Sequence, residues 1–515
     1  MTDRDEIQDE ISVDVEVEKS EMEEKKESTN CRVPIVEVSK ESASDTWSAL
    51  NEAINAATYI ALDLELSGLG NRSGLSSRLA DDRYHFLCEI ANSYSILSFG
   101  LCCCTLSEQT DSMELSCVTF NILLHCQKPY MIEPQAVQFL LSHGFDFNKQ
   151  YSRGLPYWPG NDIPKRKVVK FHQECPYNVA SLLELLITSS KPIVLHNGLV
   201  DLVFMYQAFH TDLPASLAYF TADLSEMFPA GLYDTKTIAV FEEHEHATYL
   251  EYIFRKSQRE NDACHSRKDG FVDVQFSVPS NCEEWVELIS FEERRRNYTS
   301  SLNLCPYYAR LGFCGMRDKC EHVHDVDIVL DKMEQSVMKK RKRNHRNRKR
   351  KSMMSNFTDT KTTSEPSPKK HHSEVVLTEL FSEEIGTAKQ RLSNEVQHLP
   401  AEENHFDQSS SDPTSEKRFS GHRAGFDAFM TAYSFAMYLS KKKASNKQPN
   451  GKACTETEAE SAMKTDFAEL ESVKNKIVMG GRPLPLLIAK SHFTKTSSNH
   501  QLRMAELLKK SSSVT

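Results

Sequence analysis

The sequence predicts an α/β fold in which helices flank a mixed β-sheet. Short apolar runs typical of strands alternate with amphipathic helical segments, which is the pattern of a sheet with helices on its faces. Two of these runs, at residues 60–66 and 191–195, are largely apolar, as expected for strands buried on both faces. Both lead into polar residues, and functional sites form at the carboxyl ends of such strands.

The first half of the chain supplies most of the expected elements. Apolar runs predict strands at Val33–Val38, 58–66, Ser95–Cys104, Cys117–Leu124, Tyr130–Met131 and Lys191–Leu195. Helical periodicity predicts helices at Ser44–Ala57, Arg83–Tyr94, Pro134–Ser142, Tyr177–Thr188, from Leu199 onward, and after Tyr233 to about Phe254. Residues 143–170 are polar and rich in Gly and Pro, so we expect a long surface loop there. Periodicity is lost over 256–300.

The second half of the chain is mostly polar and contains one further ordered region. A cysteine-rich segment at 305–324 is followed by a basic block and by a polar stretch that continues to about residue 417. Apolar residues then recur at helical spacing and predict another core helix, through Phe426, Phe429, Met430, Tyr433 and Met437. Pro483–Ile488 is expected to add a final strand.

Charge is strongly segregated along the chain. The 515 residues carry a formal net charge of −11, with 39% hydrophobic and 26% charged residues and a mean hydropathy of −0.50. Residues 1–27 hold twelve acids against four bases, whereas ten of the thirteen residues in Lys339–Lys351 are Lys or Arg. Blocks of like charge repel internally and are typical of solvated tails and linkers.

The composition favours a soluble intracellular protein with no membrane association. The acidic N-terminus has neither the basic region nor the apolar region of a signal peptide. The longest apolar run, around Ile96–Leu106, is too short to span a bilayer. Most of the fourteen cysteines are scattered in apolar runs, as expected for buried thiols in a reducing compartment.

The stretch Thr58–Leu69 carries two acids on one face of a buried strand. Alternate residues of a strand point to the same side, so Asp63 and Glu65 share a face. Two carboxylates in such a place are costly unless a cation is bound there, and a divalent metal ion would compensate their charge. Acid pairs with this spacing arise about ten times by chance in a chain of this composition, so the pair needs partners elsewhere.

Asp201 and Asp427 are the candidate partners. Each is expected at a position from which a side chain can converge over the sheet with Asp63 and Glu65. Three or four carboxylates can hold two divalent cations about 3.5–4 Å apart, the arrangement used for in-line displacement at phosphorus. Mg²⁺ suits such an oxygen-only site. His422 lies five residues before Asp427 and could take a proton from the attacking water. Taken singly, each acid can instead be a helix cap or solvated, and His422 a surface histidine.

Four motifs occur in the order found in a known nuclease family. They are D-L-E at 63–65, H-N-G-L-V-D at 196–201, Y-D-T-K at 233–236 and H-R-A-G-F-D at 422–427. This order resembles the DEDD exonucleases of the His-containing subtype, in particular the deadenylase branch of poly(A)-specific ribonuclease and the Caf proteins. The resemblance covers roughly 33–255 and 418–440. The sequence departs from the family pattern at Leu64, where Thr or Gly is common, and at Leu66, where many members have Phe.

The resemblance implies an RNase H-like mixed sheet, and it implies a catalytic role for each of five residues. Asp63, Glu65, Asp201 and Asp427 would be ligands of two Mg²⁺ ions, and His422 would be the general base. The implied activity is 3′→5′ hydrolysis of single-stranded RNA with an A-rich 3′ tail.

Three cysteines and one histidine have the spacing of a metal site. Cys305, Cys314, Cys320 and His324 follow the pattern C-x8-C-x5-C-x3-H. Three thiolates and one imidazole make a closed tetrahedral site for one structural Zn²⁺. The segment resembles CCCH fingers that bind single-stranded RNA, in which bases stack on aromatic side chains. Tyr308 is the candidate aromatic residue, and whether this finger reads sequence stays open.

The basic block has the composition of a nuclear localisation signal. A run of like charges is usually a solvated segment without a specific role, and a basic run binds any nucleic acid weakly. A linker dense in Lys and Arg is also typical of a signal that a nuclear import receptor binds. We expect nuclear import, with auxiliary RNA contact, from Lys339, Lys340, Arg341, Lys342, Arg343, Arg346, Arg348, Lys349, Arg350 and Lys351.

The expected organisation is one nuclease fold split by an insertion. The parts are an acidic disordered tail (1–30), the nuclease in two parts (31–260 and 418–500), a CCCH finger (297–328), a basic nuclear-localisation and disordered linker (335–415) and a C-terminal tail (501–515). The combination resembles nuclear deadenylases, which implies small nuclear RNA substrates and a place in the nucleoplasm, nucleolus, and Cajal bodies or nuclear speckles. The alternatives are a non-catalytic CCCH RNA-binding regulator on a nuclease-like scaffold and a DNA 3′ exonuclease.

Overall fold

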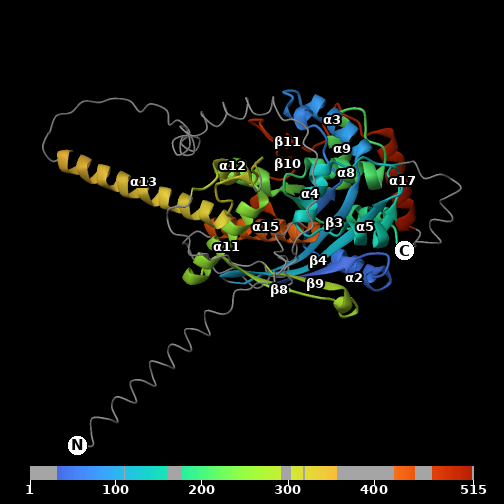
Figure 1. Ribbon diagram of the computed structural model, residues 1–515, viewed down its shortest axis with the longest axis horizontal. Coiled ribbons are helices and arrows are strands. Elements are labelled where there is room, and N and C mark those ends of the chain that lie inside the picture. The colour runs from blue at the N-terminus through green and yellow to red at the C-terminus, as the bar shows by residue number, and fades with distance from the viewer. Residues whose placement is uncertain are drawn as a thin grey trace, which may run out of the picture.

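One large mixed sheet organises the molecule. The structure is a computed structural model that describes residues 32–109, 111–160, 177–290, 303–316, 319–355, 423–446 and 467–512. Among these residues, eleven strands form the sheet, in the order β11-β10-β7-β6-β2-β3-β4-β1-β9, with β5 and β8 paired to β4 (Figure 1). Their bounds are Arg32–Val38 (β1), Tyr59–Leu66 (β2), Ile96–Glu108 (β3), Ser112–Cys126 (β4), Leu155–Tyr157 (β5), Ile193–Leu195 (β6), Leu232–Asp234 (β7), Phe271–Phe276 (β8), Val286–Ser290 (β9), Lys476–Ile477 (β10) and Leu486–Leu487 (β11).

The direction of the strands places their carboxyl ends side by side on one half of the sheet. The strands β2, β6, β7 and β10 run parallel to one another, while β3 is antiparallel to both β2 and β4. Parallel strands need crossover connections, and helices supply them here. The mixed sheet flanked by helices confirms the predicted α/β class.

Helices cover both faces of the sheet. They are α2 (Ala43–Ala56), α3 (Ala80–Ser93), α4 (Pro134–Ser142), α5 (Phe147–Arg153), α7 (Val179–Thr188), α8 (Leu199–Met205), α9 (Leu217–Met227), α10 (Thr235–Thr237), α11 (Leu250–Arg267), α12 (Pro306–Leu311), α13 (Val326–Ser355), α15 (Ala424–Asn446) and α17 (Ser498–Ser512). The helices α2, α3, α7, α8 and α9 contribute to the larger apolar core on one face. On the other face, α15 and α11 contribute to a second core.

The helix α15 lies across the central strands although it follows the insertion in the sequence. It packs on β2, β3 and β4 and is covered by α11. The Phe254 ring of α11 lies 6.3, 5.9 and 5.5 Å, centroid to centroid, from the rings of Phe426, Phe429 and Tyr433. Burying a side chain of this size contributes roughly 1.5–3 kcal/mol. The aromatic face of α15 therefore holds the helix firmly on the sheet.

The structure corrects the sequence-based boundaries of the nuclease fold in its first part. Residues 256–300 contain the second half of α11 and the strands β8 and β9, so the fold continues past residue 260 to Ser290. Polar residues alternate along β8, and ion pairs cover the outer side of α11, which masks the periodicity. The expected loop over 143–170 includes α5 and β5, and no strand forms at Tyr130–Met131.

The C-terminal boundary was also wrong. The predicted tail at 501–515 is largely the helix α17, which runs to Ser512 and buries Leu507. His500 is fully buried at its start, where its Nε2 donates to Glu226 Oε2 at 3.2 Å. Much of α17 is Lys and Ser, so the short apolar stripe of this helix gives little helical periodicity in the sequence.

The predicted disordered linker at 335–415 is partly helical. The helix α13 begins against α11 and continues to Ser355, so the basic block at 339–351 is helical (Figure 1). Its first turns bury Val329, Leu330 and Met333. Lys and Arg are good helix formers, which lets the anchored helix continue into the basic sequence. The remainder of the predicted linker, and the acidic tail at 1–30, lie outside the residues described.

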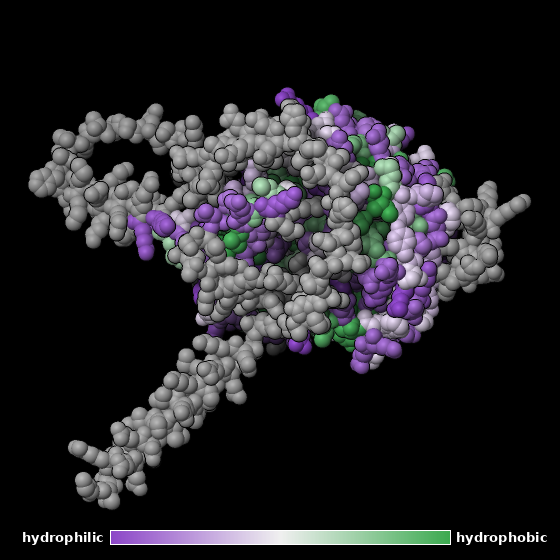
Figure 2. All heavy atoms as spheres, viewed as in Figure 1, coloured by the Kyte–Doolittle hydropathy of each residue, from purple (hydrophilic) through white to green (hydrophobic). Residues whose placement is uncertain are grey.

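On the face shown in Figure 2, hydrophilic residues predominate and small apolar patches interrupt them. No helix among the described residues is long and apolar enough to cross a membrane. The cysteines in this part of the chain are all free thiols.

Candidate functional site

The central strand β2 carries Asp63 and Glu65 on the face that α15 covers. Tyr59 and Ala61, which precede them at a spacing of two, belong to the apolar core beneath α15. Because side chains alternate along a strand, Asp63 and Glu65 emerge on the same face, at the end of β2 where the core gives way to polar groups. The strand thus delivers two carboxylates beneath the first turn of α15.

A glycine opposite Asp63 lets α15 approach the sheet. In the β2–β3 ladder, Asp63 pairs with Gly100. A Cβ atom on Gly100 would lie 1.9 Å from the Ala424 carbonyl oxygen and 2.4 Å from the Gly425 nitrogen. The Gly425 N–H donates to Asn121 Oδ1 at 3.2 Å, which fixes the start of α15 over β4. The bare backbone at Gly100 therefore sets the position of the whole first turn.

That first turn brings Asp427 to the two acids of β2. The carboxylate oxygens of Asp63, Glu65 and Asp427 lie within 4.8 Å of one another. Burial raises the pKa of Asp63 well above its ordinary value, and the neighbouring Asp427, Asp201 and Glu65 raise it further. Three carboxylates held this close repel one another strongly unless a cation lies between them. The donor set, oxygen atoms only, suits a hard divalent ion such as Mg²⁺.

Asp201 lies beside this group from the first turn of α8. It is not one of the three acids within 4.8 Å, yet its charge contributes to the raised pKa of Asp63. Burial raises the pKa of Asp201 itself to about 7, Asp234 adds to the effect, and a hydrogen bond from the Leu64 backbone opposes it. The contact with Leu64 places Asp201 against β2.

Asp234, which the sequence analysis did not single out, ties together the strand ends around Asp201. Its Oδ1 accepts from the backbone N–H groups of Asn197 and Lys236 at 2.8 and 2.9 Å, and its Oδ2 accepts from the Val478 N–H at 3.0 Å. Asn197 has a left-handed backbone (φ 62°) in the turn that leads into α8. Asp234 therefore joins β7, β10 and the turn that positions Asp201. Its place in the Y-D-T-K motif was the signal available in the sequence.

We expect Asp234→Asn to reduce RNA hydrolysis by about 10- to 100-fold, the range typical of residues that orient metal ligands. The amide would present N–H groups toward a backbone donor, and an unsatisfied buried group costs about 1–3 kcal/mol. The measurement is the single-turnover rate as a function of Mg²⁺ concentration. Asp212→Asn, at an exposed acid in a different loop, is the control. Wild-type rate and metal dependence for Asp234→Asn would exclude this positioning role.

His422, the predicted general base, lies outside the described residues. The description resumes at Arg423, which forms an ion pair with Glu287 of β9 and so anchors the chain directly before α15. The role of His422 stays a prediction.

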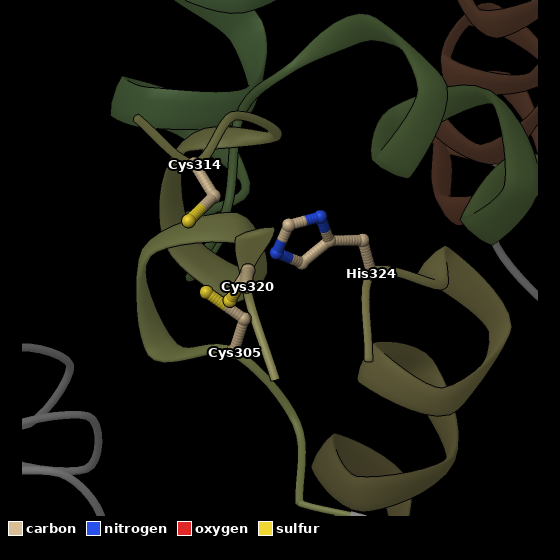
Figure 3. Close-up of side chains that lie close together, drawn as sticks. All are labelled: Cys305, Cys314, Cys320 and His324. Atoms are coloured by element: carbon tan, nitrogen blue, oxygen red, sulfur yellow. The ribbon is translucent and has the colours of Figure 1, made fainter. Parts of the chain in front are cut away.

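The three cysteines and the histidine of the predicted finger converge. The ligand atoms of Cys305, Cys314, Cys320 and His324 lie within 4.8 Å of one another. Figure 3 shows the His324 imidazole directed toward the three sulfur atoms. A short bridge between Leu304 and Val323 closes the loop at its base, with the Cys305 N–H donating to the Val323 carbonyl at 3.1 Å. Thiolates and imidazole in this number are the ligands of a structural divalent metal site.

Tyr308 packs inward and does not match the predicted exposed stacking residue. Its ring stacks on His324 with centroids 5.1 Å apart and planes at 16°, and its hydroxyl donates to Glu251 Oε2 of α11 at 3.1 Å. Gly312 (φ 71°) lies against Tyr249, whose ring would be 2.6 Å from a Cβ there. This side of the finger is used to dock on the nuclease fold. Phe313, in contrast, is 54% exposed.

Ion pairs fix the finger and the start of α13 to α11. Arg255 contacts Asp327 at 3.0 Å, and Arg259 contacts both Asp327 and Asp331, at 3.0 and 2.8 Å. Arg255 and Asp327 are largely removed from water, where such pairs resist screening by salt. The finger is therefore part of the same folded body as the nuclease sheet.

We expect Cys314→Ala to lower the bound zinc by one ion per chain and to make residues 303–325 sensitive to protease. Structural zinc sites of this size contribute most of the local folding energy. Hydrolysis of a short RNA should stay within a few-fold of wild type, because the carboxylates lie on other elements. Zinc content and limited proteolysis are the measurements. Cys264→Ala, which removes a buried thiol from α11, is the control. Unchanged zinc content in Cys314→Ala would contradict the assignment.

The predicted localisation residues form part of α13. Lys339 and Lys342 are exposed there. The helix carries the block away from the sheet (Figure 1). Recognition by an import receptor stays a prediction.

The sequence pattern of the CAF1 family ribonuclease matches residues 38–176 and 165–435. Among curated proteins, an uncharacterized protein of Schizosaccharomyces pombe is 32% identical over 122 residues, which is 22% of this chain and 28% of that protein. Poly(A)-specific ribonuclease PARN is 25% identical over 135 residues in Xenopus laevis (24% of this chain, 21% of that one) and 29% over 120 residues in Homo sapiens (21% and 18%). The matches span less than a third of the length of these relatives.

Among solved structures, the Mg²⁺- and Mn²⁺-bound form of S. pombe Pop2p is similar at 19% identity and a TM-score of 0.32, covering 44% of this chain and 82% of that one. The RNase domain of yeast Pop2 is similar at 14% identity and a TM-score of 0.31, covering 43% of this chain and 75% of that one.

The family pattern extends over most of the chain, on both sides of the finger, and ends at residue 435 within α15. The family resemblance found in the sequence is confirmed, and the chain belongs to the CAF1 ribonuclease family.

Proposed function

We propose that the protein is a Mg²⁺-dependent 3′→5′ exoribonuclease that removes adenosines from single-stranded, A-rich 3′ tails. The observation that carries the proposal is the convergence of Asp63, Glu65 and Asp427 within 4.8 Å, from elements on both sides of the inserted finger. Family membership supports RNA as the substrate. The similarity to poly(A)-specific ribonuclease supports adenosine tails.

The carboxylates and the histidine have different proposed roles, metal binding and proton transfer. Asp63, Glu65 and Asp427, with Asp201 beside them, would hold two divalent ions. Such ions stabilise the charge that develops on the attacking and leaving oxygens of an in-line displacement. His422 would take the proton of the attacking water, because an imidazole has a pKa close to the working pH. Burial raises the pKa values of Asp63 and Asp201, and bound divalent ions would favour the charged form of both carboxylates.

The proposed setting is the nucleus, with small nuclear RNAs among the substrates. The basic block in α13 supports import, and the CCCH finger with one structural Zn²⁺ supports an additional contact with RNA. Because Tyr308 is used for docking, that contact would involve the exposed Phe313 instead.

The expected result is that wild-type protein shortens a 5′-labelled RNA with a 3′ oligo(A) tail in Mg²⁺, one nucleotide at a time, and that EDTA stops the reaction. Asp63→Ala with Glu65→Ala should abolish shortening, because two of the converging carboxylates are removed. Tails of U, C and G, run in parallel, test the preference for adenosine, and a deoxyribose tail tests RNA against DNA.

The matched control removes two exposed acids, Asp81→Ala with Glu89→Ala, from α3. It should keep the wild-type rate. Unchanged shortening by the Asp63/Glu65 double variant would refute the proposed mechanism. Binding of RNA without shortening by the wild-type protein would favour the non-catalytic regulator instead.

A further inference from the structure

Three cysteines converge in the core beneath α15, away from the finger. Cys102 and Cys104 lie two residues apart on β3, so both point to the same face of the sheet. Cys117 of β4 is paired directly with Cys104 in the antiparallel ladder. The Sγ atoms of Cys102 and Cys104 are 3.6 Å apart, and those of Cys104 and Cys117 are 3.8 Å apart. All three Sγ atoms lie within 4.8 Å of one another.

The cluster is enclosed by the core. Its three side chains are 0–1% exposed and belong to the apolar cluster that includes Tyr59 and Phe435. The Thr119 hydroxyl donates to Cys102 Sγ at 3.5 Å, and the Tyr59 hydroxyl lies against Cys104. Cys103, between two of the cysteines, faces the opposite core. The convergence is therefore confined to one face.

We propose that Cys102, Cys104 and Cys117 form a second thiolate metal site, which binds a thiophilic d¹⁰ ion, Zn²⁺ or Cu⁺. With metal–sulfur bonds of about 2.3 Å, sulfur atoms around a tetrahedral ion lie about 3.8 Å apart, and those around a trigonal ion about 4.0 Å. The Sγ–Sγ separations of 3.6 and 3.8 Å lie close to these values. Two residues at i and i+2 of one strand, with a third on the antiparallel neighbour, converge on one point because the pleat directs all three to one side.

Metal binding at this site releases protons from the three thiols. Three S–H groups lose three protons to solvent as one ion forms three metal–sulfur bonds, and nothing is oxidised or reduced. Zn²⁺ leaves a net charge of −1 in the core and prefers a fourth ligand, for which the Thr119 and Tyr59 hydroxyls are the candidates. Cu⁺ accepts three thiolates but leaves −2. Either ion would cross-link β3 to β4 directly beneath α15.

The site is tested by counting metal in the full-length protein. Protein produced with added zinc is exchanged into excess Mg²⁺, and zinc is measured by elemental mass spectrometry. We expect two zinc ions per chain in the wild type, one in the finger and one in the core. Cys102→Ala with Cys117→Ala should lose one, while the matched control Cys103→Ala keeps both. A second arm adds Cu⁺ without oxygen and counts copper in the same three proteins, which separates the two ions.

Native mass spectrometry of the wild type gives the count without any substitution, so a poorly folding variant leaves the test intact. One thiolate-bound ion per chain in both arms would overturn the proposal. Equal metal content in the double variant and in Cys103→Ala would overturn it too. After denaturing alkylation without reductant, a chain lighter than the fully alkylated one by two alkyl groups and about 2 Da would show a disulfide such as Cys104–Cys117 instead, and would equally refute a metal site.

Discussion

Asp427→Asn is expected to slow 3′ shortening of RNA by well over 100-fold while leaving the fold intact. Substitutions of residues that only orient metal ligands cost 10- to 100-fold, and Asp427 belongs to the converging group itself. The amide keeps the size of the side chain in the tightly packed first turn of α15, where Asp427 is 5% exposed. The measurements are the rate on a 5′-labelled oligo(A)-tailed RNA and circular dichroism of the variant.

The matched control for Asp427→Asn is Asp81→Asn, which neutralises an exposed acid in the first turn of α3. Both changes remove one favourable interaction with a helix N-terminus, worth about 0.3–1 kcal/mol at an exposed site. Only the change in α15 should affect the rate. A rate within a few-fold of wild type in Asp427→Asn would remove that residue from the site.

Gly100→Val is expected to reduce activity by about 100-fold or more through displacement of α15. A Cβ at this position would meet backbone atoms of Ala424 and Gly425, and backbone cannot move aside as the end of a flexible side chain can. Overpacking of a core costs roughly 1–3 kcal/mol, and a misplacement of about 1 Å at a catalytic group can cost about 100-fold. The rate and the thermal midpoint should both fall, and Gly100→Ala should give an effect of the same sign.

Gly315→Val is the control for added volume, because no atom lies within 4 Å of a Cβ placed there. It should keep the wild-type rate and stability. Wild-type activity in Gly100→Val would mean that the close approach of α15 to β3 is not needed to position Asp427.

The sequence predicted the central strands and the helices that cross the sheet because these are buried and keep a clear hydrophobic period. It did not predict β8 and β9, because their alternating polar residues and the ion pairs on α11 hide the pattern. The helix α17 was missed for a related reason, since only a narrow stripe of it is buried. Helix formation by the basic block depends on anchoring at Val329 and Leu330, a tertiary effect that composition does not reveal.

The candidate site was predicted through its motifs, while the groups that support it were not. Spacing on β2, together with the resemblance of the ordered motifs to a nuclease family, selected Asp63, Glu65, Asp201 and Asp427. The roles of Gly100 and Asp234 depend on which strands are neighbours, and only the ladder shows that. A glycine inside a predicted strand was nevertheless a signal of close backbone approach.

Binding of Mn²⁺ is the most direct test of a metal site built from acids on both sides of the insertion. Free Mn²⁺ is measured by electron paramagnetic resonance as the ion is titrated into wild-type protein, Asp427→Asn and Asp81→Asn. We predict two bound ions per chain for wild type and Asp81→Asn, and at least one fewer for Asp427→Asn. The same number of ions with the same affinity in all three proteins would contradict a site shared between β2 and α15.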